Sequence, residues 1–251
     1  MESRGLMLEI DWDERRQVVI PGDYTSSLAF CKDHFIKCYE NSIKDHGFFS
    51  VALSGGSTPK ALFSLLTTPP CSSTIDWSKL YLFWSDERAV PKDHPESNFH
   101  MAMEAGFAKM PIPKSQIHRM EAEKEIEEEA LLYEKLLQST LYKNSFDLVM
   151  LGMGEDGHTA SLFPQTEGLK SQSRLVIANY IPQKSCWRMT LTFACINMSS
   201  NIVIYVLGES KKQMLHSVLH SNQGTYPIQY VGTQKHKALW IVDEAAASLI
   251  L

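Results

Sequence analysis

The chain lacks the segments that mark membrane and secreted proteins. No apolar run approaches the roughly 20 residues that a helix needs to cross a bilayer. The N-terminal stretch from Met1 to Asp11 carries acidic side chains where a signal peptide requires an unbroken apolar segment. The sequence therefore predicts a cytoplasmic protein that makes no use of a membrane.

Paired cysteines are also missing. The five cysteines are odd in number and contain no C-x-x-C pair, which argues against a disulfide framework and against a zinc site. Cys31 and Cys38 share a helical spacing with Leu28 and Phe35, which is typical of the buried face of a helix. We therefore expect reduced, structural cysteines and no metal.

Basic clusters, linkers and repeats are absent as well. The chain has 24 lysines and arginines against 29 acidic residues, a net charge of -5, and gives no support to a nucleic-acid surface. A small anionic substrate needs only a few local cations and stays compatible with this charge. No Gly/Ser linker, repeat or low-complexity segment divides the chain, so we expect residues 1–251 to form a single domain.

Several catalytic signatures do not occur. There is no Walker A sequence and no dinucleotide fingerprint. No H-E-x-x-H pair is present, which disfavours a metal hydrolase. No G-x-S-x-G elbow is present either, and Ser161 lacks the setting of a nucleophile. A general base acting on water is the hydrolytic mechanism that remains.

What the chain does contain is an alternation of apolar strand-like runs with helical patterns. We expect helices over 24–45, from Lys60 onward, and after the acidic stretch 121–129, and strands over 18–20, 48–53, 80–84, 148–151, 189–193, 202–207 and 238–242. This order predicts an α/β fold with a Rossmann-like, mostly parallel sheet and helices on both faces. Ligands of such sheets bind beyond the carboxyl ends of the strands. We call the segment that directly follows a strand its exit; the most polar exits in this chain begin at Ser54, Ser85 and Gly152.

The exit after Gly152 is the strongest catalytic candidate. Gly152 and Gly154 interrupt the strand, and Asp156, Gly157 and His158 follow. His158 is the only side chain there that exchanges a proton near neutral pH without a large pKa shift, and Asp156 is placed to orient it. Residues 159–163 are expected to open a helix. The alternative is a turn with an internally satisfied histidine, because Asp-Gly is a common turn pair.

The two other exits carry groups suited to a phosphate. Gly55 and Gly56 precede an expected helix, so the backbone can approach a ligand and the helix N-terminus can bind an anion; a serine or threonine cap is the alternative. Arg88 can clamp a phosphate bidentately with Asp86 or Glu87 holding it, the alternative being a surface ion pair. Arg188, just ahead of an expected strand, is a further cation.

Three motifs, Ser54-Gly-Gly-Ser-Thr-Pro59, Ser85-Asp-Glu-Arg88 and the run from Gly152 to Pro164, occur in the order and spacing of the 6-phosphogluconolactonase family. Asn98, Arg188-Met-Thr-Leu-Thr192 and the stretch from Leu239 to Ala246 add to a resemblance over nearly the whole chain. The family implies a fold shared with glucosamine-6-phosphate deaminase and ribose-5-phosphate isomerase. It implies hydrolysis of 6-phospho-D-glucono-1,5-lactone to 6-phosphogluconate in the oxidative pentose phosphate pathway, without a cofactor.

On this resemblance, His158 held by Asp156 is the catalytic base. Arg88 and Arg188 clamp the phosphate, and further binding groups are expected among Gly55, Gly56, Ser57, Thr58, Lys60, Asp86 and Gly157. The expected partner is a small phosphosugar lactone. Backbone N–H groups near Gly55 and Gly56 or at Gly157 are candidates for stabilising the oxyanion.

Two alternative functions share this fold. Glucosamine-6-phosphate deaminase has the same Gly-x-Gly-x-Asp-Gly-His core, but it typically continues with Ile-Ala-Phe-Asn-Glu-Pro where this chain reads Thr159 to Pro164. It also carries Met-Asp-Glu-Tyr where this chain ends in Arg88, so the lactonase is favoured. A non-catalytic sugar-phosphate sensor would normally carry a helix-turn-helix segment, for which the roughly 20 residues before the first expected strand leave no room.

Overall fold

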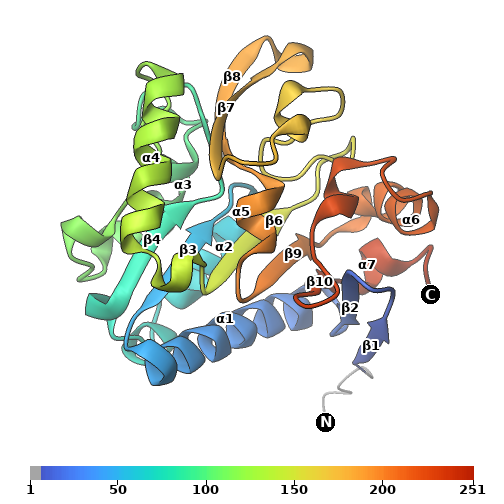
Figure 1. Cartoon of the computed structure of the whole chain (residues 1–251). Helices are drawn as coiled ribbons and strands as arrows, with labels where there is room; N and C mark the ends of the chain where they lie inside the picture. Colours follow the sequence, from blue (N-terminus) through green and yellow to red (C-terminus); the bar gives the residue numbers. More distant parts are fainter. Residues whose placement is uncertain (1–6) are drawn as a thin grey trace.

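The computed structural model describes residues 7–251, which form a seven-stranded sheet, a separate three-stranded sheet and surrounding helices (Figure 1). In spatial order the large sheet contains β1 (Leu8–Asp11), β2 (Arg16–Ile20), β10 (Ala238–Val242), β9 (Ile202–Val206), β6 (Leu148–Gly152), β3 (Phe49–Leu53) and β4 (Leu80–Trp84). Only β1 pairs antiparallel within it. The expected mostly parallel α/β sheet is confirmed.

The helices cover both faces of this sheet. In Figure 1 the strands lie between α1 (Tyr24–His46) below and α5 (Phe193–Asn197) above. The other helices are α2 (Ser57–Leu66), α3 (Asn98–Glu104), α4 (Ile126–Thr140), α6 (Lys212–His220) and α7 (Glu244–Ala247). Every residue of β3 and β9 is buried, as parallel strands covered on both faces require.

Helix α1 illustrates how local sequence sets these boundaries. Asp23 caps its N-terminus by accepting a hydrogen bond from the amide of Ser26, and Gly47 ends it in the left-handed conformation at φ 92°. Cys31, Phe35 and Cys38 are buried, so the helical face expected from their spacing is confirmed.

The small sheet is antiparallel and consists of β5 (Asp86–Arg88), β8 (Cys186–Leu191) and β7 (Val176–Ile181), in that order. Strands β7 and β8 form a hairpin that stands above the large sheet, beside α4 (Figure 1). Strand β5 begins one residue after β4 ends, so the chain passes directly from the large sheet into the small one.

One expected element is wrong and another has different bounds. Residues 159–163 open no helix: Thr159 and Leu162 form an isolated bridge around a tight turn in which Ala160 has φ 47°. The strand expected over 189–193 ends at Leu191, because the side chain of Thr192 accepts a hydrogen bond from the amide of Cys195 and so begins α5. None of the helices within residues 7–251 is both long and apolar enough to cross a bilayer.

Candidate active site

A cavity of about 680 Å³ opens at the carboxyl ends of the central strands. Strands β6, β3 and β4 are neighbours in the large sheet, so the polar segments that follow them meet at one edge. Residues from all three segments line the cavity, among them Gly55, Asp86 and His158. The three segments therefore converge on one cavity, as their positions after neighbouring strands predict.

His158 and Asp156 form a hydrogen-bonded pair in this cavity. The distance between Nδ1 of His158 and Oδ1 of Asp156 is 2.5 Å, and the backbone amide of His158 donates to the same oxygen at 3.1 Å. The imidazole stacks on the ring of Phe163, with centroids 3.8 Å apart and an interplanar angle of 16°. With Nδ1 engaged by the carboxylate, Nε2 is the nitrogen left for chemistry.

The surroundings of His158 favour its neutral form. Burial lowers the pKa of His158 below its ordinary value of 6.5, and Lys184 acts in the same direction, whereas Asp156 and Asp86 oppose the shift. Burial raises the pKa of Asp156, but its bonds to His158 outweigh this and leave that pKa below its ordinary value. A neutral imidazole beside an ionised carboxylate is the pairing that a general base requires.

Glycines make room for this pair. A Cβ on Gly154 would lie 2.0 Å from Nδ1 of His158, so any other residue there would displace the imidazole. Gly157 has φ 73°, its amide donates to the carbonyl of Gly154 at 3.2 Å, and a Cβ on it would lie 2.6 Å from the ring of Tyr226. Gly157 does not line the cavity, so its geometry gives it a conformational role in the turn.

Arg88 and Arg188 lie directly opposite each other on β5 and β8, and both line the cavity. Like charges in such a cross-strand pair repel. In the described part of the chain, the Nε atoms of both arginines are buried and lack a hydrogen-bond partner. Nη1 of Arg188 is 4.0 Å from Asp86, and Nη1 of Arg88 donates to the carbonyl of Glu96. The pair is thus arranged to receive an anion.

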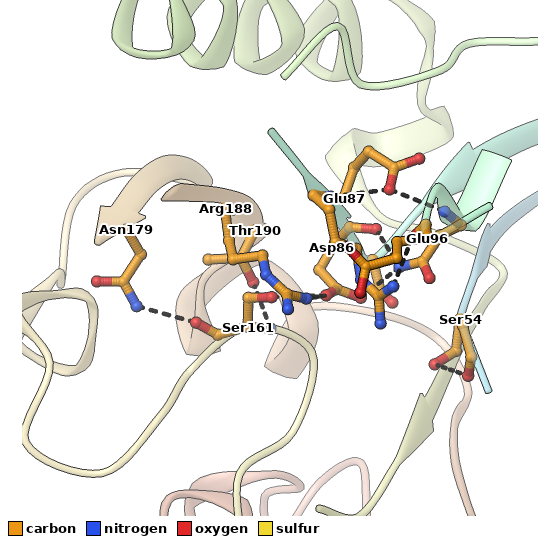
Figure 2. Close-up of polar contacts among 12 residues, drawn as sticks. Ser54, Asp86, Glu87, Glu96, Ser161, Asn179, Arg188 and Thr190 are labelled. Carbon is orange, nitrogen blue, oxygen red and sulfur yellow. Dashed lines mark hydrogen bonds and ion pairs between the residues drawn. The ribbon is translucent and has the colours of Figure 1, made fainter. Parts of the chain in front are cut away.

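The acidic residues of this segment hold other parts of the site in place. Asp86, 5% exposed, accepts hydrogen bonds from the hydroxyl of Ser161 at 2.6 Å and the side-chain amide of Asn98 at 3.3 Å (Figure 2). Glu87 accepts from the hydroxyl of Ser97 and from the backbone amides of Arg88, Asn98 and Phe99, which fixes the start of α3. Burial raises the pKa of Glu87 despite these bonds.

The N-terminus of α2 offers uncapped backbone amides to the cavity. Its cap residue is Gly56, with φ 106° and no side-chain hydrogen bond, so the alternative of a capping serine or threonine is wrong. Gly55 packs so closely on Asn98 that a Cβ would lie 2.1 Å from the side-chain oxygen. Ser57 and Thr58 line the cavity with these glycines, whereas Lys60 is exposed and does not. Unpaired N–H groups at a helix start favour an anion.

The structure adds cations that the motifs did not single out. Lys184 lines the cavity from the turn between β7 and β8, and Lys211 lines it while its Nζ donates to the carbonyl of Met153 at 2.8 Å. Both are distant in sequence from the glycine-rich segments, and no local pattern distinguishes them from surface lysines.

Comparison with known proteins shows the family to which the chain is related. A family model described as glucosamine-6-phosphate isomerases/6-phosphogluconolactonase matches residues 23–240. The 6-phosphogluconolactonase of Chlamydia pneumoniae is 37% identical over 237 residues, covering 93% of this chain and 90% of that protein. The structure of 6-phosphogluconolactonase from Trypanosoma cruzi is similar with a TM-score of 0.82 at 25% identity, covering 96% of this chain and 98% of the other.

A monomeric glucosamine-6-phosphate deaminase is also similar in structure, with a TM-score of 0.76 at 21% identity over 92% of this chain and 99% of the other, which shows a shared fold alone. The match to the family model extends over most of the chain, and the identity to the chlamydial relative extends over nearly all of it. The chain therefore belongs to the 6-phosphogluconolactonase family, within the wider glucosamine-6-phosphate isomerase/6-phosphogluconolactonase group.

Proposed function

We propose that this protein hydrolyses 6-phospho-D-glucono-1,5-lactone to 6-phosphogluconate, the lactone-opening step of the oxidative pentose phosphate pathway. The observation that carries the proposal is one cavity holding both the His158–Asp156 pair and the opposed arginines Arg88 and Arg188. A lactone bearing a distal phosphate needs a base for water at one end and a cationic clamp at the other. Family relatives named 6-phosphogluconolactonase support this substrate.

In the proposed mechanism His158 acts first as a base and then as an acid. Its Nε2 takes a proton from water while the water oxygen attacks the lactone carbonyl carbon, giving a tetrahedral oxyanion. The oxyanion collapses, the bond from this carbon to the ring oxygen breaks, and the imidazolium returns the proton to that oxygen. Asp156 holds Nδ1–H throughout and stabilises the transient imidazolium.

We assign the oxyanion to the amides at the start of α2, around Gly55 and Gly56, because this helix end has no side-chain cap. The amide of Gly157 already donates to the carbonyl of Gly154, which leaves it unsuited to that role. Arg88 and Arg188 hold the phosphate, whose dianion offsets their mutual repulsion. Lys184 and Lys211 add positive charge to the cavity wall.

A deaminase is less well supported by the site. That reaction moves a proton from a sugar carbon and needs a carboxylate free to act as a base. Asp86 is the buried carboxylate beside the clamp, and Ser161 and Asn98 already occupy its oxygens. A direct test measures turnover of the phosphorylated lactone and of glucosamine 6-phosphate at controlled pH, with spontaneous lactone hydrolysis subtracted. Turnover of the amino sugar alone would contradict the proposal.

The pH dependence should follow His158. The base works only when neutral, so kcat/KM falls about tenfold per pH unit below its pKa. Because burial and Lys184 lower that pKa, we expect activity to persist at pH 6.5 and the acid limb to have its midpoint below 6.5. A background-corrected profile of kcat/KM against pH measures this midpoint. A midpoint above 6.5 would contradict the environment described for His158.

Adding a methyl group at position 154 should displace His158 and so lower activity, although the histidine itself is unchanged. In Gly154→Ala the new Cβ would meet the imidazole of His158 at 2.0 Å and push it away from Asp156. Misplacement of a catalytic group by about 1 Å costs on the order of 10²-fold in rate. Gly152→Ala is the matched comparison, because a Cβ there meets nothing within 4 Å and its effect should be far smaller. Equal kcat values for the two variants would contradict this view of the turn.

A further inference from the structure

Ser161 lies in the turn that follows His158 and connects this turn to the small sheet through all three of its polar groups. Its hydroxyl donates to Asp86 on β5 at 2.6 Å, and its amide donates to the hydroxyl of Thr190 on β8 at 3.1 Å. Its carbonyl accepts from the side chain of Asn179 on β7 at 2.9 Å. Each strand of the small sheet thus contributes one partner (Figure 2). Ser161 is fully buried.

These three partners lie on the face of the small sheet that carries the arginine pair. The register places Arg88, Arg188 and Asn179 in one row across the strands. Asp86 and Thr190 form the adjacent row, two residues along each strand. Since residues two apart on a strand share a face, the clamp and the anchors of Ser161 are parts of one surface. The carboxylate of Asp86 lies between them, bonded to Ser161 and 4.0 Å from Arg188.

The turn that Ser161 anchors carries the base at its start and the stacking ring at its end. His158 precedes Ser161 by three residues, and Phe163 follows it by two. Between them Ala160 has φ 47°, a conformation that a non-glycine residue keeps only where its surroundings enforce it. The bonds of Ser161 supply that enforcement from the small sheet.

From this geometry we propose that Ser161 is a positioning residue of the reaction: through Asp86 it sets the place of the His158 imidazole relative to the arginine clamp. The inference rests on the proposed lactonase function and adds that Ser161 couples the position of His158 to that of the two arginines. A substrate whose phosphate is held by the arginines then presents its carbonyl at the point where the base is held. Ser161 itself does not line the cavity, so it acts through the turn and not by contact with substrate.

The test uses Ser161→Ala and Ser161→Cys in the full chain. Alanine removes the hydroxyl without adding volume, whereas cysteine fills the site with a larger group that is only a weak donor, so a loss shared by both variants reports the missing hydrogen bond and not the packing. We expect both variants to lower kcat about 10- to 100-fold, the scale of losing a hydrogen bond to a charged group, with KM for the phosphorylated lactone changing less than about twofold. Ser199→Ala is the matched control, a fully buried serine whose hydroxyl bonds the carbonyl of Cys195 just before β9 begins.

A double-mutant cycle with Asp86→Asn identifies the route of the effect. If Ser161 acts through Asp86, then Ser161→Ala added to Asp86→Asn lowers kcat far less than it does in the wild-type background. Additive losses would overturn the coupling. An unchanged kcat in both single variants, or a raised KM at constant kcat, would also overturn it. Absence of turnover of the phosphorylated lactone by the wild-type protein would instead overturn the proposed function itself. Wild-type turnover is therefore measured before any variant is tested.

Discussion

Replacing His158 by alanine should lower kcat by about 10²- to 10⁴-fold, the usual contribution of a general base. Among residues 7–251, the variant loses the only histidine that lines the cavity, the group suited to take a proton from water near neutral pH and return it to the leaving ring oxygen. The arginines are untouched, so KM for the phosphorylated lactone should change little. Background-corrected initial rates measure both constants.

Two further variants make this experiment specific. Asp156→Asn keeps the imidazole but removes the negative charge that holds Nδ1–H and stabilises the imidazolium, so kcat should fall as well. His216→Ala removes an exposed histidine on α6 and serves as the control with unchanged kcat. Full activity of His158→Ala above the spontaneous rate would refute the proposed mechanism.

Replacing Arg88 by alanine should raise KM for the phosphorylated lactone about 10- to 100-fold, because a hydrogen bond to a charged group is worth about 1.5–3 kcal/mol. The free protein should keep its fold, since the change removes one of two like charges placed opposite each other on β5 and β8. kcat should fall much less than KM rises, because the clamp holds a part of the substrate that does not react. Steady-state kinetics and thermal unfolding measure these two effects.

A substrate without a phosphate shows whether the effect of Arg88→Ala depends on phosphate binding. Hydrolysis of unphosphorylated glucono-1,5-lactone should be nearly the same in wild type and Arg88→Ala, because that substrate offers the arginines no dianion. Arg88→Lys should recover only part of the lost affinity, since an ammonium group cannot reproduce bidentate guanidinium contacts. Arg119→Ala is the matched control, because Arg119 pairs with Glu123 at 2.7 Å and does not line the cavity. An unchanged KM in Arg88→Ala would remove the clamp from the mechanism.

Much of the large sheet is predictable from local pattern. The strands β4 and β10 have the bounds expected from sequence, because each is a short apolar run that both faces of a parallel sheet bury. The exits at Ser54, Ser85 and Gly152 converge because parallel neighbouring strands end at one edge. This regularity is why the sequence predicts that His158 and Arg88 lie at one edge of the sheet, and both line the same cavity.

Local pattern fails where partners far apart in sequence decide the conformation. Strand β5 has only three residues and exists because it pairs with β8, a hundred residues later in the chain. The segment after His158 has helix-like composition, yet the bonds of Ser161 to β5, β8 and β7 hold it as a turn. Lys184 lines the cavity from the turn between β7 and β8, and Lys211 lines it from the residue before α6. No spacing in the sequence predicts either position.

The sequence by itself determined the α/β class, the family resemblance and the pairing of Asp156 with His158, because apolar periodicity, glycine placement and a motif two residues apart are local properties. Only the tertiary structure decided that Arg88 and Arg188 face each other, and that Ser161 ties the base to the surface bearing them. The physical reason is that strand register is set by hydrogen bonds between distant segments, and a shift of one residue between β5 and β8 would place Arg88 and Arg188 on opposite faces of the small sheet.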